Sequence, residues 1–483
     1  MLSSLNFRNI PKMDELLQDG RFAIFKSCAT PSKIAQLLRE ELNEIRTQIS
    51  QGQYIDASRD ELHETVVLRV YEALHAIHAN RLRRVINATG VVMHTNLGRS
   101  SLSSYASAKV AEIATSYSNL EYSTLTGRRR SRLEYAIHLL TDLTGAEDAL
   151  VVNNNAAAVF LALSTLAGDT HTGGASLAPT MSAFPVISEK PQVILSRGEI
   201  VEIGDGFRIS EIIAETGCRI VEVGATNRTT LDDYQNAITA DTAALLKIHS
   251  SNYKIVGYTG SVGTDALASL ARERGIPLIE DMGSGVLTDL SQFGFPYERT
   301  PADAIADGAD LVTFSGDKCL GGPQAGIIIG KKSLIKRLRE NPIMRCLRID
   351  KLCLAALEAT LESYIEGEAT PTIRCVSSTR IKEKAEVLQS ALVQAIGDTF
   401  QVRVMPHNGR FGGGAMPLTT IESYGVYITG RFSPNIIETA LRTAEPPIIA
   451  TIQDDCLVLN MLTVSDEDFQ HIIGTFQTLD GLR

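Results

Sequence analysis

A glycine-rich stretch, "FSGDKCLGGPQAG" from Phe314 to Gly326, places a single lysine on a tightly turned segment of backbone. Its four glycines can adopt positive φ or let a ligand approach the backbone closely. A lysine on such a loop is held in place, and a lysine amine is the group that forms Schiff bases with carbonyl compounds. Lys318 is therefore the first candidate for covalent or acid–base chemistry.

Two further polar clusters follow runs that are typical of buried strands. "EDMGSG" follows "IPLI" and supplies Asp281, whereas "NNNAAAV" follows "ALVV" and supplies Asn153, Asn154 and Asn155 at the start of a helical pattern. In open α/β sheets, ligands bind at the carboxyl ends of the strands. Because Lys318 itself follows the run "LVTF", we expect these side chains to lie near it.

An acid, a lysine and an amide-rich helix start are the groups that bind pyridoxal 5′-phosphate (PLP). The lysine forms the Schiff base, and a carboxylate such as Asp281 keeps the pyridine nitrogen protonated so that the ring accepts electrons. A helix N-terminus with free backbone N–H groups binds the phosphate, and the hydroxyl of Ser315 is a candidate further donor. The sequence therefore predicts a PLP site.

Each of these features also has an ordinary structural explanation. A lysine among glycines is usually a solvated loop residue, an aspartate at a strand end is often a helix N-cap, and three asparagines can form a turn. Their joint occurrence, each directly after a buried-strand pattern, favours PLP. Nucleotide-binding loops are disfavoured, because no GxGxxG follows the first core strand and GxxxxGK[ST] does not occur in the sequence.

An α/β domain must position these residues. From about residue 85 to 366, short apolar runs alternate with helical patterns, which predicts a parallel sheet flanked by helices. The runs are "DALVV", "QVILS", "CRIVEVG", "AALLKIH", "IPLIED", "ADLVTFS" and "AGIIIG". After them, residues 367–483 carry strands and helices in mixed order ("QVRVMP", "YGVYITG", "DCLVLNML"), which predicts a smaller α+β domain. Residues 168–191, rich in Gly, Ser, Thr and Pro, are predicted to be a surface insertion.

Residues 1–84 have a different pattern, with helical apolar spacing as in "IAQLLREELNEIRTQI" and few strand candidates. They carry 12 basic and 11 acidic residues, whereas the whole chain has a net charge of −10. Arg81, Arg83 and Arg84 suit a nucleic-acid contact, but capping of a helix C-terminus against its dipole explains them equally well. His75 and His78 are predicted to be packing residues.

Composition sets the broad class of the protein. A chain of 483 residues, 44% hydrophobic and 21% charged, is typical of a globular protein with two or three domains. No apolar run is long enough to span a bilayer, and the amino terminus lacks the pattern of a secretion signal. Seven cysteines without a CxxC pair predict reduced thiols in the cytoplasm. The nine histidines show neither HExxH nor a Cys/His cluster, so no metal site is predicted.

Several long segments, in order along the chain, are specific enough to indicate a family. They are "RRVINATGVVMHTNLGRS", "YSNLEY", "LTGAEDALVVNNNAAAVFLAL", "SRGEIVEIGDGFRI", "VEVGATNRT", "NYKIVGYTG", "EDMGSG", "TFSGDKCLGGPQAGIIIG" and "LRIDKLCLAALEATL". Through these segments, over nearly its whole length, the sequence resembles the bacterial selenocysteine synthases, that is the L-seryl-tRNA(Sec) selenium transferases.

The resemblance implies a fold and an assembly. The fold is that of the fold-type-I PLP-dependent transferases, with an aspartate aminotransferase-like large domain over residues 85–366 and a small α+β domain over 367–483. Residues 1–84 are implied to be a helical domain that binds tRNA. The assembly implied is a homodecamer, a pentamer of dimers, in the cytoplasm.

The resemblance also implies a reaction, the conversion of L-seryl-tRNA(Sec) to L-selenocysteinyl-tRNA(Sec) with selenophosphate. Lys318 is the Schiff-base lysine and, once released as a free amine, the natural base for the α-proton, while Asp281 keeps the ring protonated. Elimination of the serine hydroxyl gives aminoacrylyl-tRNA, which accepts selenium at its β-carbon. Asp317 is a candidate for providing or positioning the proton that the hydroxide needs, and a structural hydrogen bond is the more ordinary role for it.

An anionic selenium donor requires cations, and the resemblance assigns Arg99, Arg345 and Arg348 to the selenophosphate site. Arg345 and Arg348 share a face if the segment "MRCLRID" is helical, and forked guanidinium groups suit phosphate-like oxygens. The alternative is a solvated basic face. Because active sites of such enzymes lie at dimer interfaces, one of these arginines is a candidate contribution of a neighbouring subunit.

Three residues near these motifs allow two interpretations each. His249 in "KIHSSNY" is a candidate for a place near the cofactor ring, and Asn252 for a hydrogen bond to the phenolic oxygen of the cofactor. Either can equally be a packing residue. Cys319, next to the lysine, has the position of a reactive thiol, but free cysteines are commonly small buried side chains, and we favour packing.

Two rival functions stay open at this point. The first is a PLP-dependent lyase or transferase of the same fold that acts on a small amino acid or amino sugar without tRNA; salt-dependent tRNA binding by residues 1–84 would distinguish it. The second is a noncatalytic tRNA-binding or assembly protein on a degenerate PLP scaffold. The presence of both Lys318 and Asp281 disfavours the second.

Overall fold

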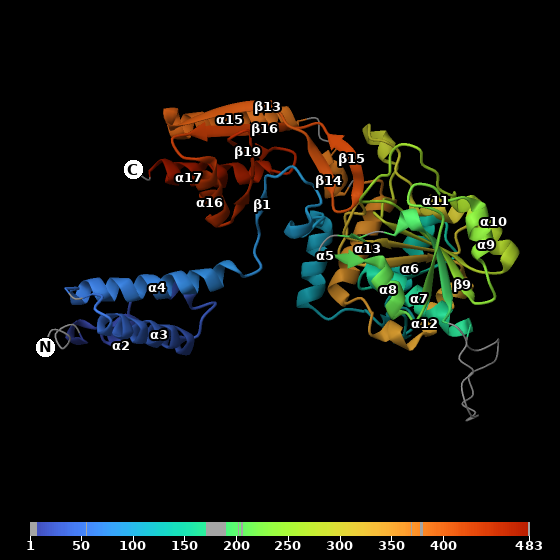
Figure 1. The fold of residues 1–483 in the computed structure, drawn as a ribbon, viewed down its shortest axis with the longest axis horizontal. Helices are drawn as coiled ribbons and strands as arrows, with labels where there is room; N and C mark the ends of the chain where they lie inside the picture. The colour runs from blue at the N-terminus through green and yellow to red at the C-terminus, as the bar shows by residue number, and fades with distance from the viewer. Residues whose placement is uncertain are drawn as a thin grey trace, which may run out of the picture. The chain divides into compact units, whose positions relative to one another are not determined.

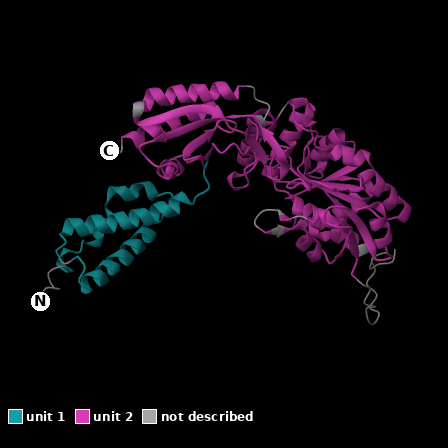
Figure 2. Cartoon of the chain, turned by 45° about the horizontal axis from the view of Figure 1, so that its top comes forward, with its two compact units in different colours: residues 1–84 teal, residues 85–483 magenta. Residues whose placement is uncertain are grey.

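The computed structural model of the chain describes residues 7–54, 56–170, 190–200, 202–203, 206–368, 370–376 and 380–481. The chain divides into two compact units, residues 1–84 and residues 85–483 (Figure 2). The predicted insertion at 168–191 falls mostly on residues 171–189, outside the described residues. Its first three residues continue helix α7 (Asn155–Thr170), so the regular structure extends slightly further than the composition indicated.

The first unit is helical. Its two long helices, α3 (Pro31–Ser50) and α4 (Arg59–Ala79), place their apolar stripes in one hydrophobic core. Both begin at side-chain caps: the Thr30 hydroxyl accepts the N–H of Lys33, and Ser58 forms a capping box with Glu61. The shorter elements of the unit are η1 (Phe7–Asn9), α2 (Met13–Leu17) and η2 (Gly20–Phe25).

Two of the three histidines of α4, His75 and His78, contact aromatic rings in this unit. The His75 ring stacks on Tyr71 with 6.1 Å between ring centroids, and His78 meets Phe25 edge-on at 6.0 Å. Aromatic pairs with this spacing stabilise a core by dispersion and by their ring quadrupoles. His78, which is half-buried, packs as predicted, whereas His75 stacks on Tyr71 but stays exposed.

A seven-stranded sheet forms the centre of the second unit (Figure 1). Each of the seven apolar runs found in the sequence is one of its strands. In order across the sheet they are β4 (Asp148–Val152), β12 (Gly326–Gly330), β11 (Leu311–Ser315), β10 (Leu278–Gly283), β9 (Thr242–Ile248), β5 (Gln192–Ser196) and β8 (Arg219–Val223).

The prediction of a parallel sheet is wrong for one strand. β12 runs antiparallel to both of its neighbours, β11 and β4. Only residues 316–325 join β11 to β12, and a parallel connection requires a crossover of a dozen or more residues. The segment that makes this short return is the glycine-rich loop with Lys318.

Helices cover both faces of the sheet (Figure 1). On one face, alternate strand residues such as Leu246 and Ile279 pack in a core with α6 (Glu134–Thr144), α7 and α12 (Lys332–Glu340). On the other face, the intervening residues Leu245 and Leu278 pack against α10 (Thr264–Arg274). The other helices of this region are α5 (Ser104–Thr115), α8 (Ile209–Glu215), α9 (Leu231–Ala237), α11 (Pro301–Ala306) and α13 (Lys351–Ile365).

A second, four-stranded antiparallel sheet follows in the same unit, and its long strands match the runs expected for the carboxyl-terminal part. Its order is β13 (Phe400–Pro406), β16 (Tyr424–Gly430), β19 (Cys456–Asn460) and β18 (Thr451–Gln453). Near it lie α14 (Pro371–Val376), α15 (Ile381–Ile396), α16 (Pro434–Thr443), α17 (Phe469–Asp480) and the hairpin β14 (Gly409–Gly412) and β15 (Ala415–Ile421).

Residues just after the boundary between the two units belong with this carboxyl-terminal region. β1 (Ile86–Asn87) pairs in parallel with β17 (Ile448–Ile449). The remaining short elements are β2 (Tyr122–Ser123), β3 (Arg128–Arg129), β6 (Glu202–Ile203), β7 (Phe207–Arg208), η3 (Thr95–Leu97), η4 (Arg197–Glu199), η5 (Leu290–Phe293), η6 (Pro342–Arg345), η7 (Gly397–Thr399) and η8 (Asp466–Asp468).

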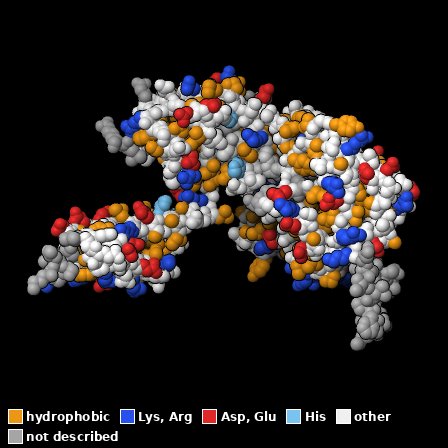
Figure 3. Space-filling view, viewed as in Figure 1, with side chains coloured by type: hydrophobic (Ala, Val, Ile, Leu, Met, Phe, Trp, Pro, Cys, Tyr) orange, Lys and Arg blue, Asp and Glu red, His pale blue; other side chains and the backbone are white. Residues whose placement is uncertain are grey.

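The surface shows how the net charge is spread. On the face drawn in Figure 3, Lys and Arg side chains alternate with Asp and Glu and do not form one continuous basic patch. Among the described residues, no helix is both long enough and apolar enough to cross a membrane. Because the chain has a net charge of −10, a polyanionic partner requires local groups of cations and is not attracted by the surface as a whole.

Candidate active site

The carboxyl ends of β4, β9, β10 and β11 meet at one edge of the large sheet, since these strands run in the same direction. A cavity of about 440 Å³ opens at this edge. Its lining joins residues that are far apart in the sequence, among them Asn155, Asp281, Ser315 and Lys318. The expected convergence of polar side chains at strand ends is thus observed.

Asp281 lies on β10 with its side chain on the α7 face of the sheet, where only 5% of the residue is exposed. Its Oδ1 accepts hydrogen bonds from Asn155 Nδ2 at 2.8 Å and from Thr313 Oγ1 at 2.9 Å. Burial raises the pKa of Asp281, and these two neutral donors and Lys318 only partly oppose that effect. The carboxylate is therefore poised to gain from a cationic partner inside the cavity.

Lys318 is equally buried, with 6% of the residue exposed. Burial lowers the pKa of Lys318, with Asp281 acting in the opposite direction. Two glycines keep the space around its amine open: a Cβ at Gly283 would lie 3.9 Å from Nζ, and a Cβ at Gly414 would lie 3.6 Å from it. At neutral pH a lysine with a lowered pKa is more often the free amine than a solvated lysine is, so it is more readily available as a nucleophile and as a base.

Backbone hydrogen bonds fix the loop that carries Lys318. Gly316 N–H donates to Ala325 O at 2.9 Å, and Cys319 N–H donates to Ser284 O at 3.0 Å. Gly321 has φ +76°, and a Cβ there would lie 2.6 Å from Thr370 Oγ1, so glycine is required at this turn. The loop is therefore a rigid support for the amine.

Cys319 is a packing residue, as favoured from the sequence. Its thiol is fully buried, with Sγ 4.0 Å from Met93 Sδ. Burial raises the pKa of Cys319 to about 12, which suppresses the reactive thiolate at neutral pH.

The three asparagines at the start of α7 have different positions. Asn155 binds Asp281, and Asn154 Oδ1 accepts the N–H of Ala157 at 2.9 Å, which caps the helix. Both line the cavity together with Ala156. Asn153 is exposed and its N–H donates to Leu347 O at 2.9 Å, so it does not line the cavity.

Asp317 and Arg99 form an ion pair at the cavity wall, with 2.6 Å between Asp317 Oδ2 and an Arg99 guanidinium nitrogen. Arg99 adopts φ +60°, a conformation that only a few per cent of non-glycine residues adopt. Both side chains line the cavity. The structure thus joins the predicted proton-handling acid to one of the predicted anion-binding arginines.

Arg345 and Arg348 do not line this cavity. Arg345 ends the 3-10 helix η6, whereas Arg348 is in an extended bridge beside Val152, so the segment is not the continuous helix that would place them on one face. Both are exposed, and Arg348 lies 3.5 Å from Glu121 Oε1. The helical premise for their shared face is therefore wrong.

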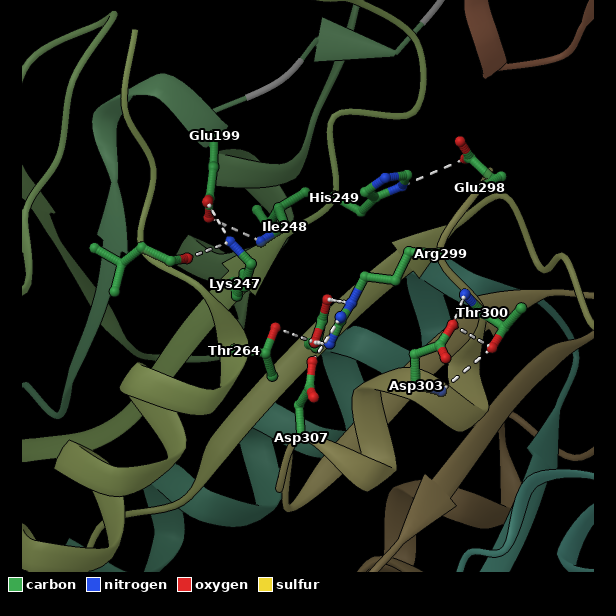
Figure 4. Close-up of polar contacts among 12 residues, drawn as sticks. Glu199, Lys247, Ile248, His249, Thr264, Glu298, Arg299, Thr300, Asp303 and Asp307 are labelled. Atoms are coloured by element: carbon green, nitrogen blue, oxygen red, sulfur yellow. Dashed lines mark hydrogen bonds and ion pairs between the residues drawn. The ribbon is translucent and has the colours of Figure 1, made fainter. Parts of the chain in front are cut away.

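His249 and Asn252 both line the cavity at the end of β9. In Figure 4, His249 and Glu298 point toward each other; His249 Nδ1 lies 3.8 Å from Glu298 Oε1. Burial raises the pKa of Glu298. Asn252 Nδ2 donates to the backbone oxygen of Glu202 at 3.1 Å, which leaves its second N–H available.

Sequence reasoning missed several lining residues. Gly413 and Gly414 come from the turn between β14 and β15 and approach Lys318 from a distant part of the chain. The run "GGG" at 412–414 is the only local sign of them. Thr313 was also missed, although a polar residue inside the buried strand "LVTFS" is a signal, because such a hydroxyl needs a buried partner.

The residues present fit PLP. Asn155 Oδ1 is buried without a hydrogen-bond partner, and the Asp281 carboxylate has only neutral donors, so both can gain from a bound group. The first-turn N–H groups of α7 lack intrahelical acceptors, and only that of Ala157 is taken by Asn154. The glycines beside Lys318 Nζ leave room for an aldehyde carbon. Together these features suit a small, anionic, nitrogen-containing aromatic aldehyde.

The chain was compared with known proteins. A family model described as "SelA: L-seryl-tRNA selenium transferase" matches residues 85–172 and 177–465. A protein from Alkaliphilus oremlandii named L-seryl-tRNA(Sec) selenium transferase is 40% identical over 97% of this chain and 98% of its own length. Proteins of the same name from Solidesulfovibrio magneticus and Moorella thermoacetica are each 42% identical, over 96% and 98% of this chain and 96% and 97% of their own lengths.

A solved structure has the same fold. That of D-glucosaminate-6-phosphate ammonia-lyase aligns with a TM-score of 0.57 and 24% identity, over 83% of this chain and 96% of its own. The predicted fold class, the α/β fold of the fold-type-I PLP-dependent enzymes, is confirmed. The family that the sequence resembles is also the one whose model matches.

Proposed function

Because the chain belongs to the L-seryl-tRNA selenium transferase family, we propose that it converts L-seryl-tRNA(Sec) to L-selenocysteinyl-tRNA(Sec) with PLP as cofactor and selenophosphate as selenium donor. The observation that carries this proposal is the pairing, in one cavity, of the buried amine of Lys318 with the buried carboxylate of Asp281. The enzyme is accordingly a PLP-dependent selenotransferase.

The cofactor would be held by residues on three strand ends. Lys318 would hold its aldehyde carbon, Asp281 its ring nitrogen, and the first turn of α7 with Ser315 its phosphate. When bound, PLP supplies an electron sink for the bonds of an attached α-amino group. Asn252 and His249 line the remaining wall of the cavity. One N–H of Asn252 donates to Glu202 O, and the second would donate to the cofactor.

Lys318 is the proton carrier of the reaction. Its low exposure and lowered pKa favour the free amine, which accepts a proton from the serine α-carbon. Asp281 supports this transfer because its buried negative charge stabilises positive charge on the side of the cavity that faces it. Both residues therefore act inside the same cavity.

Departure of the serine hydroxyl requires a proton at the β-oxygen. Asp317 is the acid beside Lys318, and its ion pair with Arg99 fixes the position of its carboxylate. Because a carboxylate paired with Arg99 is ionised and carries no proton of its own, we assign Asp317 the task of positioning the proton donor through a hydrogen bond. Elimination then leaves an aminoacrylyl group on the tRNA. The selenium of selenophosphate adds at its β-carbon, and hydrolysis of the phosphorus–selenium bond releases phosphate.

Arg99 is the arginine that lines the cavity in a single chain and the first candidate for the selenium donor. Arg345 and Arg348 are exposed and lie outside the cavity. They would therefore bind the selenium donor only if the donor is held between two subunits. A homodecamer built as a pentamer of dimers is the assembly proposed for that purpose. We place the enzyme in the cytoplasm, where its cysteines stay reduced.

Residues 1–84 are proposed to bind the tRNA. Their near-neutral charge contrasts with the strongly acidic remainder of the chain. Hydrogen–deuterium exchange of the full chain, with and without tRNA(Sec), tests this role, and protection is expected in α3 or α4. Protection confined to residues 85–483 contradicts it.

One assay tests the function directly. The purified protein with PLP is incubated with seryl-tRNA(Sec) and selenophosphate, and the product is assayed as selenocysteinyl-tRNA, with free serine as the control substrate. Conversion of the charged tRNA alone is expected. Conversion of free serine but not of the charged tRNA would instead assign the protein to the small-molecule PLP lyases.

A further inference from the structure

The proposed substrate sets a geometric requirement. The seryl group is esterified to the terminal ribose of the tRNA, so the last nucleotide must lie within one amino-acid length of the amine of Lys318. The cavity that contains Lys318 must therefore border a second space that accepts a nucleotide. This inference rests on the proposed function and concerns which space that is.

Two described cavities share lining residues with the one around Lys318. The smaller, about 290 Å³, shares Arg99 and Asp317, and its lining includes no aromatic side chain. The larger, about 430 Å³, shares Ile248 and His249 at the end of β9 and includes Tyr253. Since Arg99 and Asp317 are assigned to the donor and to proton transfer, the larger cavity is the one left for a nucleotide.

Paired charges build the floor of the larger cavity. Figure 4 shows Lys247 pointing to Glu199, at 3.1 Å, and Arg299 between Thr264 and Asp307. Arg299 also pairs with Glu280 at 3.1 Å. Because these cations are neutralised by carboxylates, the floor is polar and rigid but does not attract an anion by itself.

The rim, in contrast, carries cations without carboxylate partners. No carboxylate within ion-pair distance is recorded for Arg228 or Lys254 among the described residues, and both are exposed. The Arg228 guanidinium lies over the Tyr258 ring, 5.3 Å from its centroid, and also hydrogen-bonds its hydroxyl. This rim has the charge and the flat groups that single-stranded nucleic acid requires.

Hydrogen bonds between two loops also fix the backbone of the rim. Asn227 Nδ2 donates to Tyr258 O at 2.6 Å, Gly260 N–H donates to Asn227 O at 3.0 Å, and Thr229 N–H donates to Gly260 O at 2.9 Å. These bonds join two loops, residues 225–229 and 254–263. Tyr258 stays 78% exposed, and a hydrogen bond from Arg228 to its hydroxyl orients its ring. An aromatic ring that is oriented before binding loses less entropy when a ligand stacks on it.

We propose that this cavity and its rim bind the 3′-terminal nucleotide of the tRNA: the base stacks on Tyr258 and Arg228, and Lys254 and Arg228 neutralise the adjacent phosphates. The ribose then lies beside Ile248 and His249, where the two cavities meet. The ester carries the serine α-carbon from there to Lys318. Tyr258 and Arg228 are thus binding residues for the acceptor end and take no part in bond making.

Photo-crosslinking tests the location without any substitution in the protein. Seryl-tRNA(Sec) that ends in 8-azidoadenosine is bound to the PLP-loaded full chain, irradiated, digested and mapped by mass spectrometry. The crosslink is expected in residues 225–263, at Tyr258 or its neighbours. A crosslink confined to residues 95–102 or 317–324 would place the nucleotide in the smaller cavity and overturn the proposal.

Kinetics of matched variants give a second test. Loss of one base-stacking ring is expected to raise KM for seryl-tRNA(Sec) by about tenfold in Tyr258→Ala, with kcat nearly unchanged. Tyr258→Phe keeps the ring and is expected to recover most of that loss. Tyr117→Ala removes another exposed tyrosine, which lies outside the loops 225–229 and 254–263 and lines neither cavity, and is the control.

The outcomes separate this inference from the proposed function. If the unaltered protein does not convert seryl-tRNA(Sec), the proposed function fails. If it does, but Tyr258→Ala and Arg228→Ala leave KM within twofold of the Tyr117→Ala control, the nucleotide site is wrong although the function stands. A rise in KM that Tyr258→Phe does not relieve would assign Tyr258 a purely structural role and also overturn the site.

Discussion

Glu280 and Asp281 are consecutive residues of β10, so their side chains lie on opposite faces of the large sheet. Both are almost fully buried. Glu280 pairs with the charged Arg299 at 3.1 Å and accepts from Thr264 at 2.8 Å. Asp281 accepts from neutral groups, among them the side chains of Asn155 and Thr313.

The lysines of the two faces differ in the same way. Lys247 forms an ion pair with Glu199 at 3.1 Å and donates to Val262 O at 2.9 Å, so its amine is occupied. Lys318 has a pKa lowered by burial and two glycines that keep its amine clear. On one face the buried charges neutralise each other and stabilise the fold, whereas on the other they are kept apart for a ligand. A buried lysine and a buried acid are thus not sufficient to identify a site; the type of their partners decides.

The largest expected effect is the loss of kcat when Lys318 is replaced. Lys318→Ala removes the amine that accepts the α-proton, and kcat is expected to fall on the order of 10⁴-fold. The comparison variant is Lys247→Met, which should keep cofactor absorbance although it loses the ion pair with Glu199. Spectra and single-turnover rates check both. Bleaching of the cofactor in Lys247→Met but not in Lys318→Ala would reverse the assignment of the two faces.

The next effect is on stability, on the opposite face. Arg299→Ala leaves the fully buried Glu280 without its cation, and the free energy of unfolding is expected to fall by about 3–5 kcal/mol. Urea unfolding of the PLP-loaded protein measures it. Glu280→Gln together with Arg299→Ala should recover part of the loss, because the uncompensated charge is gone. An unchanged urea midpoint in the single variant would show that this pair does not stabilise the fold.

Asp281→Asn is expected to lower kcat by about 10²–10³-fold, because a negative charge in the cavity is lost. The same substitution should stabilise the protein without cofactor. Burial raises the pKa of Asp281 above 3.8, so ionisation costs the folded state more than the unfolded state as the pH rises. The stabilisation by Asn should therefore grow as the pH rises above the ordinary pKa of an aspartate, and should level off once the pH exceeds the raised pKa of Asp281. A stabilisation that shrinks as the pH rises would contradict the raised pKa.

The smallest expected effect tests the neutral partners of Asp281. Thr313→Val removes one donor to Oδ1, worth about 1 kcal/mol, and should move the acid limb of the kcat/KM profile upward by a little under one pH unit. The profile of the PLP-loaded variant measures this shift. A downward shift would mean that the hydroxyl does not favour the ionised carboxylate.

Much of the fold could be predicted from the sequence, because its signals are local. Each of the seven strand runs is a continuous apolar segment, and all seven are strands of the large sheet. The direction of β12 could not be read from its own residues, since it depends on the short connection that precedes it. The loop 316–325 is too short for a parallel crossover, so its length predicts that β12 runs antiparallel to β11.

The site was predictable to the extent that its residues follow strands directly. Asp281, Ser315 and Lys318 follow or end buried strands, and strand direction alone places them together. Gly414 comes from a hairpin of the carboxyl-terminal region, and its approach to Lys318 depends on tertiary packing that no local pattern encodes. The prediction that Arg348 shares a helix face with Arg345 was wrong for a related reason. The backbone of Arg348 is extended because it pairs with Val152, a residue distant in the sequence.

Borohydride reduction followed by peptide mapping tests the difference between the two faces most directly. The PLP-loaded full chain is reduced, digested and analysed by mass spectrometry for lysine that carries the reduced cofactor. The label is expected on Lys318 and absent from Lys247. A label on Lys247, or none on the peptide that contains Lys318, would contradict the claim that the α7 face of the sheet holds the reactive amine.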